Sequence, residues 1–154
     1  MKICMVGTGY VGLVSGTCFA DIGHQVYCVD KDLSKINKLN SGISPIYEPG
    51  LDELIKKNHK AKRLYFTSDL KKAITVSDII FICVGTPNIK GSLKVDLSFV
   101  FKCTKEILAI TKKKKIIVTK STVPIGTGDQ IENIIKKKKK LFSVISNPEF
   151  LREG

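Results

Sequence analysis

A glycine-rich segment near the amino terminus constrains the fold of this chain more than any other feature. Gly7, Gly9 and Gly12 form a G-x-G-x-x-G pattern that follows the apolar run Ile3–Val6 and opens a helix-forming segment. In this context the first glycine permits a tight turn, the second lets a pyrophosphate approach the backbone, and the third allows a helix to pack closely on a strand. A diphosphate would bind the N–H groups at the helix N-terminus. The alternative is an ordinary strand–turn–helix connection without a ligand.

An acidic residue at the expected distance supports the dinucleotide interpretation. Asp30 ends the second apolar run, 23 residues after Gly7, close to the spacing of about 20 residues for an acid that binds the ribose hydroxyls. A carboxylate at this position repels the additional phosphate of NADP, so we expect NAD. Lys31 and Lys35 lie nearby and tolerate a phosphate, which keeps NADP as the weaker alternative. Asp30 could instead only cap the helix that follows it.

Short apolar runs alternate along the chain with longer helix-forming segments. The predicted strands are Ile3–Val6, Val26–Val29, Leu64–Phe66, Ile79–Val84, Ile116–Thr119 and Phe142–Ile145. The predicted helices are Val11–Ile22, Ser34–Asn40, Leu51–Asn58, Leu70–Val76, Leu97–Thr111 and Asp129–Lys137. Most strand runs are rich in Val and Ile without clean alternation, as expected for strands buried on both faces of a sheet. The pattern predicts an α/β fold of the Rossmann type: a doubly wound, mostly parallel sheet of about six strands with helices on both faces.

Two local patterns refine this prediction. Ser68 and Asp96 precede helix-forming segments and are candidate N-caps. In the Leu97–Thr111 segment, an apolar stripe at helical spacing is expected to face the sheet; it comprises Leu97, Phe101, Thr104 and Leu108. With 154 residues, the chain is predicted to form one domain.

The net charge of +12 comes mostly from two lysine runs. Lys112–Lys115 and Lys136–Lys140 hold nine of the 26 basic residues, and without them the net charge falls to +3. Neither run is interleaved with aromatic residues, and no nucleic-acid-reading motif is present. We expect solvated helix ends or loops. A site for a polyanion is the alternative.

Cysteine and histidine patterns argue against a metal site. The five cysteines include no C-x-x-C pair, and the two histidines add no ligand pattern. Cys4, Cys28 and Cys83 lie in apolar runs and are expected in the core of a reduced, cytoplasmic protein. No apolar run approaches the roughly 18 residues of a membrane span. We therefore expect no metal, no membrane and no nucleic acid among the partners.

Five motifs, in order along essentially the whole chain, resemble the UDP-glucose/GDP-mannose dehydrogenase family. They are residues 1–20 with the glycine loop, Pro45–Leu51, Val84–Pro87, Lys120–Gly128 and Ser146–Gly154. The resemblance corresponds to the first of the family's domains. It implies that residues 1–154 form the NAD-binding domain and that the central helix and the C-terminal substrate domain are absent.

The resemblance also implies roles for individual residues. Those matching NAD-binding positions are Gly7, Gly9, Tyr10, Val11, Gly12, Asp30, Lys35, Thr86, Thr122 and Glu153. Thr122 and Glu149 match residues near the reacting carbon, Glu149 as a general base or water-positioning group. The strip that matches the sugar-nucleotide contact is Glu149, Phe150, Leu151, Arg152 and Glu153.

Elementary chemistry is compatible with these roles and with simpler ones. Glu149 and Glu153 are four residues apart, so a helical turn would place both on one face, where their pKa values could diverge. The hydroxyl of Thr122 can position a water or an alcohol without adding charge. The simpler interpretations are a helix cap for Thr122 and a solvated turn for the two glutamates.

The family reaction implied by the resemblance oxidises the C6 alcohol of UDP-glucose to a carboxylate with two NAD. In the family, the nucleophilic cysteine lies beyond this chain's end, so we expect the chain alone to bind NAD without turnover. The full-length enzyme is expected to be a homodimer or larger. Alternatives are a related dehydrogenase for GDP-mannose or a UDP-N-acetylhexosamine and, in another class, a stand-alone nucleotide- or polyanion-binding module.

Overall fold

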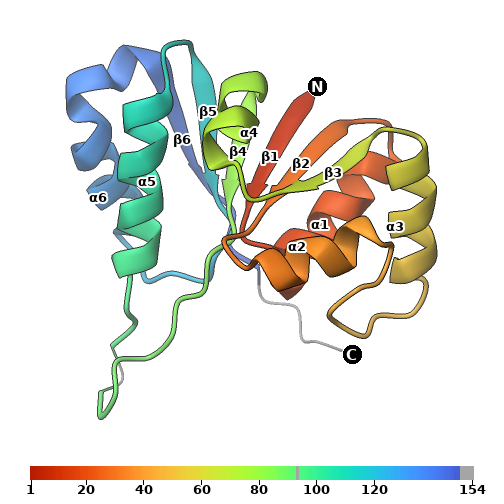
Figure 1. Cartoon of the computed structure of the whole chain (residues 1–154). Helices are drawn as coiled ribbons and strands as arrows, with labels where there is room; N and C mark the ends of the chain where they lie inside the picture. Colours follow the sequence, from red (N-terminus) through yellow and green to blue (C-terminus); the bar gives the residue numbers. More distant parts are fainter. Residues whose placement is uncertain (93, 150–154) are drawn as a thin grey trace.

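One six-stranded parallel sheet organises the chain, in a computed structural model that describes residues 1–92 and 94–149 (Figure 1). The strands are β1 (Lys2–Val6), β2 (Gln25–Val29), β3 (Leu64–Thr67), β4 (Ile79–Ile82), β5 (Lys115–Thr119) and β6 (Phe142–Ser146). Their order is β3-β2-β1-β4-β5-β6, and every neighbouring pair is parallel. The chain thus builds outward from β1 in both directions, as in a doubly wound sheet. The predicted Rossmann-type fold is confirmed.

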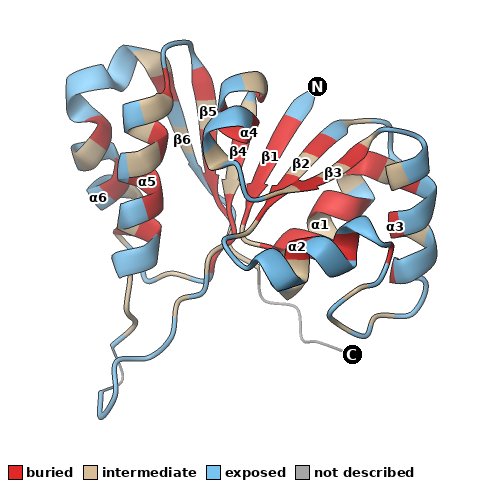
Figure 2. Cartoon of the chain, viewed as in Figure 1, coloured by how far each residue is buried: buried red, intermediate tan, exposed pale blue. Residues whose placement is uncertain are grey.

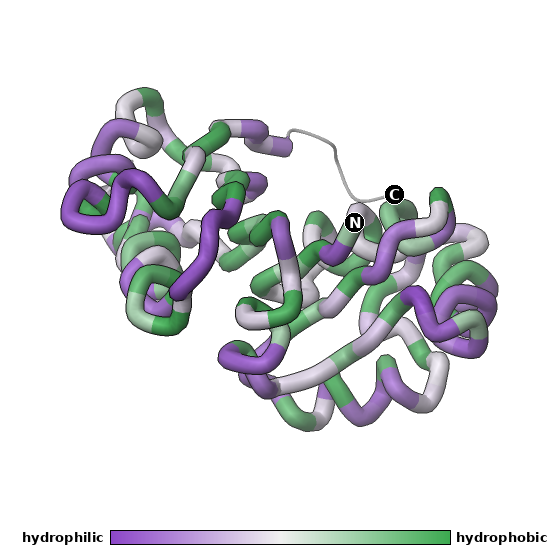
Figure 3. The backbone as a smooth tube through the Cα atoms, turned by 90° about the horizontal axis from the view of Figure 1, so that it is seen from above, coloured by the Kyte–Doolittle hydropathy of each residue, from purple (hydrophilic) through white to green (hydrophobic). Residues whose placement is uncertain are grey.

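Helices cover both faces of the sheet. They are α1 (Tyr10–Asp21), α2 (Leu33–Asn40), α3 (Leu51–Lys60), α4 (Leu70–Val76), α5 (Ser98–Ile110), α6 (Thr127–Ile135) and the 3-10 helix η1 (Lys136–Leu141). Helices α1 to α3 pack on one face and α4 to α6 on the other, each set around its own apolar core (Figure 1). Buried residues run along β1 to β5, edge strand β6 is mostly exposed, and exposed residues also lie on the outer faces of the helices (Figure 2). Hydropathy follows the same division (Figure 3).

The turn between β1 and α1 is packed without space for side chains. Gly7 has φ +104°, and a Cβ there would lie 2.5 Å from the carbonyl oxygen of Cys83. A Cβ on Gly12 would lie 2.0 Å from the carbonyl oxygen of Gly7. One turn later, a Cβ on Gly16 would lie 2.8 Å from the sulfur of Cys28 in β2. The two predicted steric roles of the motif, a tight turn and close helix packing, are therefore both present.

The caps of two helices differ from the sequence-based prediction. Asp69, not Ser68, is the N-cap of α4, and its carboxylate accepts a hydrogen bond from the backbone N–H of Lys72 at 2.8 Å. At α5 the N-cap is Leu97. Asp96 is one residue further out and accepts from the N–H of Ser98 at 2.8 Å. Both helices begin within a residue of the prediction, because a carboxylate near the helix start satisfies first-turn N–H groups from either position.

The predicted apolar stripe of α5 is shifted. The side chains that α5 buries are Val100, Cys103, Thr104 and Ile107. Phe101 and Leu108 are only partly buried at the margin of the core. Thr104 belongs to both the predicted and the observed face, whereas Val100 and Ile107 are buried in place of their neighbours Phe101 and Leu108.

Both lysine runs lie at the amino edge of the sheet. Residues 112–114 connect α5 to β5, and Lys136–Lys140 fall in η1 ahead of β6, the neighbouring strand. Each run follows a helix C-terminus, where cations are favoured, and the ammonium of Lys138 donates to the carbonyl of Leu108 at 3.0 Å. The prediction of solvated helix ends is confirmed for these eight lysines, which are exposed.

Lys115 departs from the pattern. It is buried at the start of β5, and its ammonium donates hydrogen bonds to the carbonyls of Ser77 and Thr75 just beyond and within α4. Burial lowers the pKa of this ammonium. Lys115 therefore has a structural role: its ammonium satisfies carbonyl groups at the C-terminal end of α4.

Two absences can be stated for residues 1–92 and 94–149. No helix in these ranges is both long and apolar enough to cross a membrane. In the same ranges, no three side chains of His, Cys, Asp or Glu gather as a metal site would require.

The contact between Gly12 and Gly7 yields a stability prediction. Gly12→Ala should lower the free energy of unfolding by about 3 kcal/mol, because the new methyl group overlaps backbone atoms that cannot move aside. Urea denaturation followed by circular dichroism measures the change. Gly128→Ala in α6 is the matched control: its Cβ meets no atom within 4 Å, and alanine is favoured in a helix by about 1 kcal/mol. Equal stability of the two variants would contradict the packing argument.

Candidate functional site

A cavity of about 500 Å³ opens at the carboxyl edge of the sheet, beside the paired ends of β1 and β4, where the strand order reverses direction. Its walls come from the turn after β1, the loop after β2, the end of β4 and the beginning of α5. Open α/β sheets bind ligands at this point because the loops leave in opposite directions and a crevice remains between them.

The glycine loop forms the floor of the cavity. The N–H of Gly7 donates to the carbonyl of Val29 at 2.8 Å, which ties the loop to the end of β2. A Cβ on Gly9 would meet no protein atom within 4 Å, so this glycine leaves open space where a ligand can reach the backbone. Tyr10 and Val11 begin α1 directly behind it. The first turn of α1 offers the positive end of a helix dipole to an anion.

Asp30 is held by four hydrogen bonds at the rim of the cavity. Its Oδ2 accepts from the N–H and hydroxyl of Thr8, at 3.0 and 2.8 Å, and from the ammonium of Lys35 at 3.1 Å. Its Oδ1 accepts from the N–H of Asp32 at 3.1 Å. Burial opposes ionisation of Asp30, but these hydrogen bonds outweigh it and lower its pKa to about 2. Oδ1 accepts fewer bonds than Oδ2 and keeps capacity for a ribose hydroxyl.

The alternative role of Asp30 as a helix cap is wrong. Asp32 caps α2, since its carboxylate accepts from the N–H of Lys35 at 3.1 Å. Sequence reasoning missed Thr8, which is fully buried and anchors Asp30. A hydroxyl residue directly after the first glycine was the available signal.

A second cluster joins the loops that follow β4, β5 and β6. The hydroxyl of Thr86 donates to the carbonyl of Thr122 at 2.9 Å, and the hydroxyl of Thr122 donates to the carbonyl of Glu149 at 2.8 Å. The ammonium of Lys120 lies 2.7 Å from Oε2 of Glu149, and both side chains are largely shielded from solvent, with 12% and 22% exposed. Three predicted site residues from distant segments are thus brought together, and Lys120 is an addition that the sequence did not single out.

Other predicted site residues lie outside the described part of the chain. These are Phe150, Leu151, Arg152 and Glu153. Thr122 lies in the loop after β5 and caps no helix, since α6 begins at Thr127 after Gly126.

The two cysteines that line the cavity are unsuited to nucleophilic chemistry. Cys83 and Cys103 are buried, and burial raises the pKa of Cys103 to about 12 and that of Cys83 further. A thiol that stays protonated at neutral pH is a poor nucleophile. Both therefore serve as apolar wall, in agreement with the prediction that the cysteines belong to the core.

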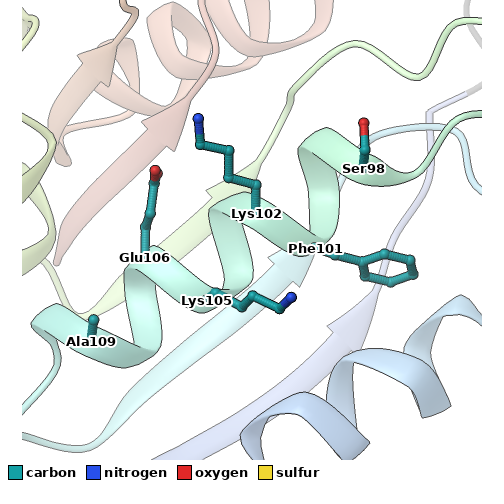
Figure 4. A pocket seen from close by; sticks show the side chains of 6 residues that line it. All are labelled: Ser98, Phe101, Lys102, Lys105, Glu106 and Ala109. Atoms are coloured by element: carbon teal, nitrogen blue, oxygen red, sulfur yellow. The ribbon is translucent and has the colours of Figure 1, made fainter.

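A second hollow of about 510 Å³ lies along α5 and, unlike the first cavity, is lined by this helix alone. Its lining residues are Ser98, Phe101, Lys102, Lys105, Glu106 and Ala109 (Figure 4). Lys102 and Glu106 point to one side of the helix, and Phe101 and Lys105 to another (Figure 4). The hollow is shaped by a single helix and contains none of the loop residues described above, so the cavity at the carboxyl edge is the better ligand site.

Comparisons with known proteins agree on one family. A family model described as the NAD binding domain of the UDP-glucose/GDP-mannose dehydrogenase family matches residues 1–154. The chain is 55% identical to a UDP-glucose 6-dehydrogenase of Rhizobium meliloti, over 100% of this chain and 36% of the relative. It is 54% identical to a UDP-glucose 6-dehydrogenase of Bacillus subtilis, over 99% of this chain and 34% of the relative. The chain thus spans about a third of the length of these relatives.

Solved structures give the same result. A GDP-mannose dehydrogenase of Pseudomonas aeruginosa superimposes with a TM-score of 0.93 at 39% identity, covering 99% of this chain and 37% of that one. A UDP-glucose dehydrogenase of Pyrobaculum islandicum superimposes with a TM-score of 0.90 at 35% identity, covering 99% and 36%.

The environment of Asp30 predicts a pH-dependent stability. Because its pKa falls from 3.8 to about 2 on folding, ionised Asp30 stabilises the fold by about 2 kcal/mol above pH 4, and this contribution disappears as the pH falls toward 2. Asp30→Asn should lose that amount at pH 7, and the gap to the wild type should close between pH 4 and 2. Urea denaturation at several pH values measures it. Asp129→Asn, an exposed residue in the first turn of α6, is the control; a gap for Asp30→Asn that persists at pH 2 would refute the assignment.

Proposed function

The chain belongs to the UDP-glucose/GDP-mannose dehydrogenase family, and from that premise we propose that it is the NAD-binding part of a UDP-glucose 6-dehydrogenase. The whole enzyme would oxidise the C6 alcohol of UDP-glucose to the carboxylate of UDP-glucuronate, consuming one water and reducing two NAD. The observation that carries the proposal is the cavity at the carboxyl edge, with an open glycine on its floor and an ionised aspartate at its rim.

Different residues of this chain would bind different parts of NAD. The first turn of α1 and Gly9 would bind the pyrophosphate, and Asp30 would accept hydrogen bonds from the adenosine ribose. Thr86 and Thr122 lie further along the carboxyl edge, at the ends of β4 and β5. They would approach the nicotinamide, which accepts a hydride from the substrate when the cofactor is bound.

We assign the acid–base work of the first oxidation to the loop cluster after β5 and β6. The carboxylate of Glu149 would take the hydroxyl proton of the substrate directly or through a water, and Thr122 would orient that hydroxyl. Lys120 supports this arrangement because it holds Oε2 of Glu149 at 2.7 Å. The hydroxyl of Thr122 already donates to the carbonyl of Glu149, so its lone pairs face outward as acceptors.

The second oxidation requires a reactive thiolate. Four of the five cysteines are buried, and burial raises the pKa of each. Cys18 is exposed on α1 and is not among the residues that line the cavity. The resemblance to the family implies that this nucleophile is none of the five, and its location stays a prediction. Assembly as a homodimer or larger likewise stays a prediction.

The proposal that the sugar nucleotide is UDP-glucose is supported by the names of two relatives similar in sequence. The curated relatives at 55% and 54% identity are UDP-glucose 6-dehydrogenases. A solved relative acts on GDP-mannose at 39% identity, so a related nucleotide-sugar dehydrogenase is the second candidate. Turnover of the full-length enzyme with UDP-glucose, GDP-mannose and a UDP-N-acetylhexosamine separates the two.

The glycine loop provides a direct test of cofactor binding. The 154-residue chain should bind NAD in a calorimetric titration and form no NADH when UDP-glucose is added. Gly9→Ala should weaken NAD binding at least tenfold, a loss of about 1.4 kcal/mol or more, with an unchanged melting temperature, since the new methyl group meets only open space in the protein. A folded wild type that does not bind NAD would overturn the proposed function.

Catalytic roles are testable in a chimera. The N-terminal third of the Bacillus subtilis relative, 54% identical over this region, is replaced by residues 1–154 of this chain. Glu149→Gln should then lower kcat by about 10²–10⁴ while the affinity for NAD changes little. Thr122→Ala should lower kcat and Thr122→Ser should restore most of it, because serine retains the hydroxyl. Equal losses for Thr122→Ala and Thr122→Ser would contradict a role for the hydroxyl.

A further inference from the structure

The cavity that contains Asp30 is lined by more lysines than carboxylates. Lysines 31, 35 and 102 all line it, against the carboxylates of Asp30 and Glu106. Lys31 and Lys35 come from the segment that follows β2, whereas Lys102 comes from α5. The lysines therefore reach the cavity from two separate elements.

In the part of the chain that the structure describes, only one of these lysines forms an ion pair with a carboxylate. Lys35 binds Oδ2 of Asp30 at 3.1 Å and offsets its charge. Within residues 1–92 and 94–149, neither Lys31 nor Lys102 forms an ion pair with a carboxylate. The ammonium of Lys31 lies 5.6 Å from the centre of the Phe99 ring, near the start of α5, so its charge faces across the cavity toward that helix. Lys102 and Glu106 extend from the same side of α5 (Figure 4), which leaves one carboxylate opposing the two unpaired cations.

Asp30 itself is strongly engaged within the protein. Its Oδ2 already accepts three hydrogen bonds, one from an ammonium. A carboxylate whose charge is compensated in this way repels a neighbouring phosphate less than an unpaired carboxylate does. The usual barrier against a phosphorylated ribose is therefore weakened here, while Lys31 and Lys102 add positive charge to the lining of the same cavity.

We propose that Lys31 and Lys102, together with Lys35, form a phosphate subsite beside Asp30 that takes the 2′-phosphate of NADP, so that the protein accepts NADP as a second and weaker cofactor. This proposal rests on the proposed function, because it places NADP in the same cavity as NAD. Asp30 keeps NAD preferred, and the lysines limit the extent of that preference. The negative charge of Glu106 offsets part of the positive charge of the three lysines.

Titrations with ligands that carry or lack the 2′-phosphate distinguish a specific phosphate subsite from general electrostatic attraction of anions. NAD and NADP are titrated into the wild-type chain, and 5′-AMP and adenosine 2′,5′-bisphosphate serve as smaller probes that differ only in the 2′-phosphate. We expect NADP to bind the wild type about ten- to a hundredfold more weakly than NAD, a difference of about 1.4–2.8 kcal/mol. The preference for 5′-AMP over adenosine 2′,5′-bisphosphate should be of similar size.

Charge variants then assign the effect to residues. Lys31→Gln combined with Lys102→Gln should weaken NADP by a further factor of about ten and leave NAD within about twofold. Lys105→Gln is the matched control, since Lys105 extends from another side of α5 (Figure 4), and it should leave the ratio of the two affinities unchanged. Asp30→Ser should move the ratio toward NADP; because Asp30 also supports the fold, the double lysine variant provides a test that does not disturb its hydrogen bonds.

The outcomes are distinguishable. Equal weakening of NAD and NADP in the double variant would show that the lysines act only as general attraction, and undetectable NADP binding in the wild type at millimolar concentration would show that the subsite does not exist. Either result overturns the subsite and leaves the NAD site standing. Failure of the folded wild type to bind NAD would instead count against the proposed function.

Discussion

The backbone contact between the turn after β1 and the first residues of α1 is the constraint on which the site depends. Gly12 lies against the carbonyl of Gly7, with no room for a side chain on either residue. This contact brings the N-terminus of α1 to the cavity beyond the ends of β1 and β4 and places Thr8 where it can bind Asp30. The two groups that a dinucleotide requires, a helix N-terminus for its phosphates and a carboxylate for its ribose, are thus positioned by one close approach of backbone to backbone.

Hydrogen bonds then prepare the polar groups for their ligand before it arrives. Asp30 is oriented by Thr8, Lys35 and the backbone of Asp32. Glu149 is oriented by Lys120, and Thr86 and Thr122 are tied to neighbouring carbonyls. Side chains that are already fixed lose little conformational entropy on binding, so more of the interaction energy is available for affinity. These residues lie in the segments that follow five strands of one sheet, β1, β2, β4, β5 and β6, so the sheet fixes where each segment begins.

Sequence reasoning recovers the parts of this structure that follow from local patterns. Short apolar runs, most of them rich in Val and Ile, identify all six strands, and the spacing from Gly7 identifies Asp30, because buried strands and their connecting turns have short-range signatures. What it misses is decided by tertiary packing. The face of α5 that meets the sheet, the partnership of Thr8 with Asp30 and that of Lys120 with Glu149 all depend on residues at least 20 positions apart or on neighbouring helices. No local pattern specifies such contacts.

The location of the lysine runs changes what the isoelectric point of about 9.5 says about this molecule. The runs stand at the amino edge, and strand β5, with five residues, separates them from the opposite edge by about 16 Å. That is roughly two Debye lengths at physiological ionic strength, over which mobile ions screen most of their field. An incoming dinucleotide in a cell therefore encounters the few charges at the mouth of the cavity and scarcely the larger number behind it. Ion-exchange and electrophoretic behaviour will therefore depend mainly on the lysine runs at the amino edge. Ligand affinity will depend mainly on the charges at the carboxyl edge.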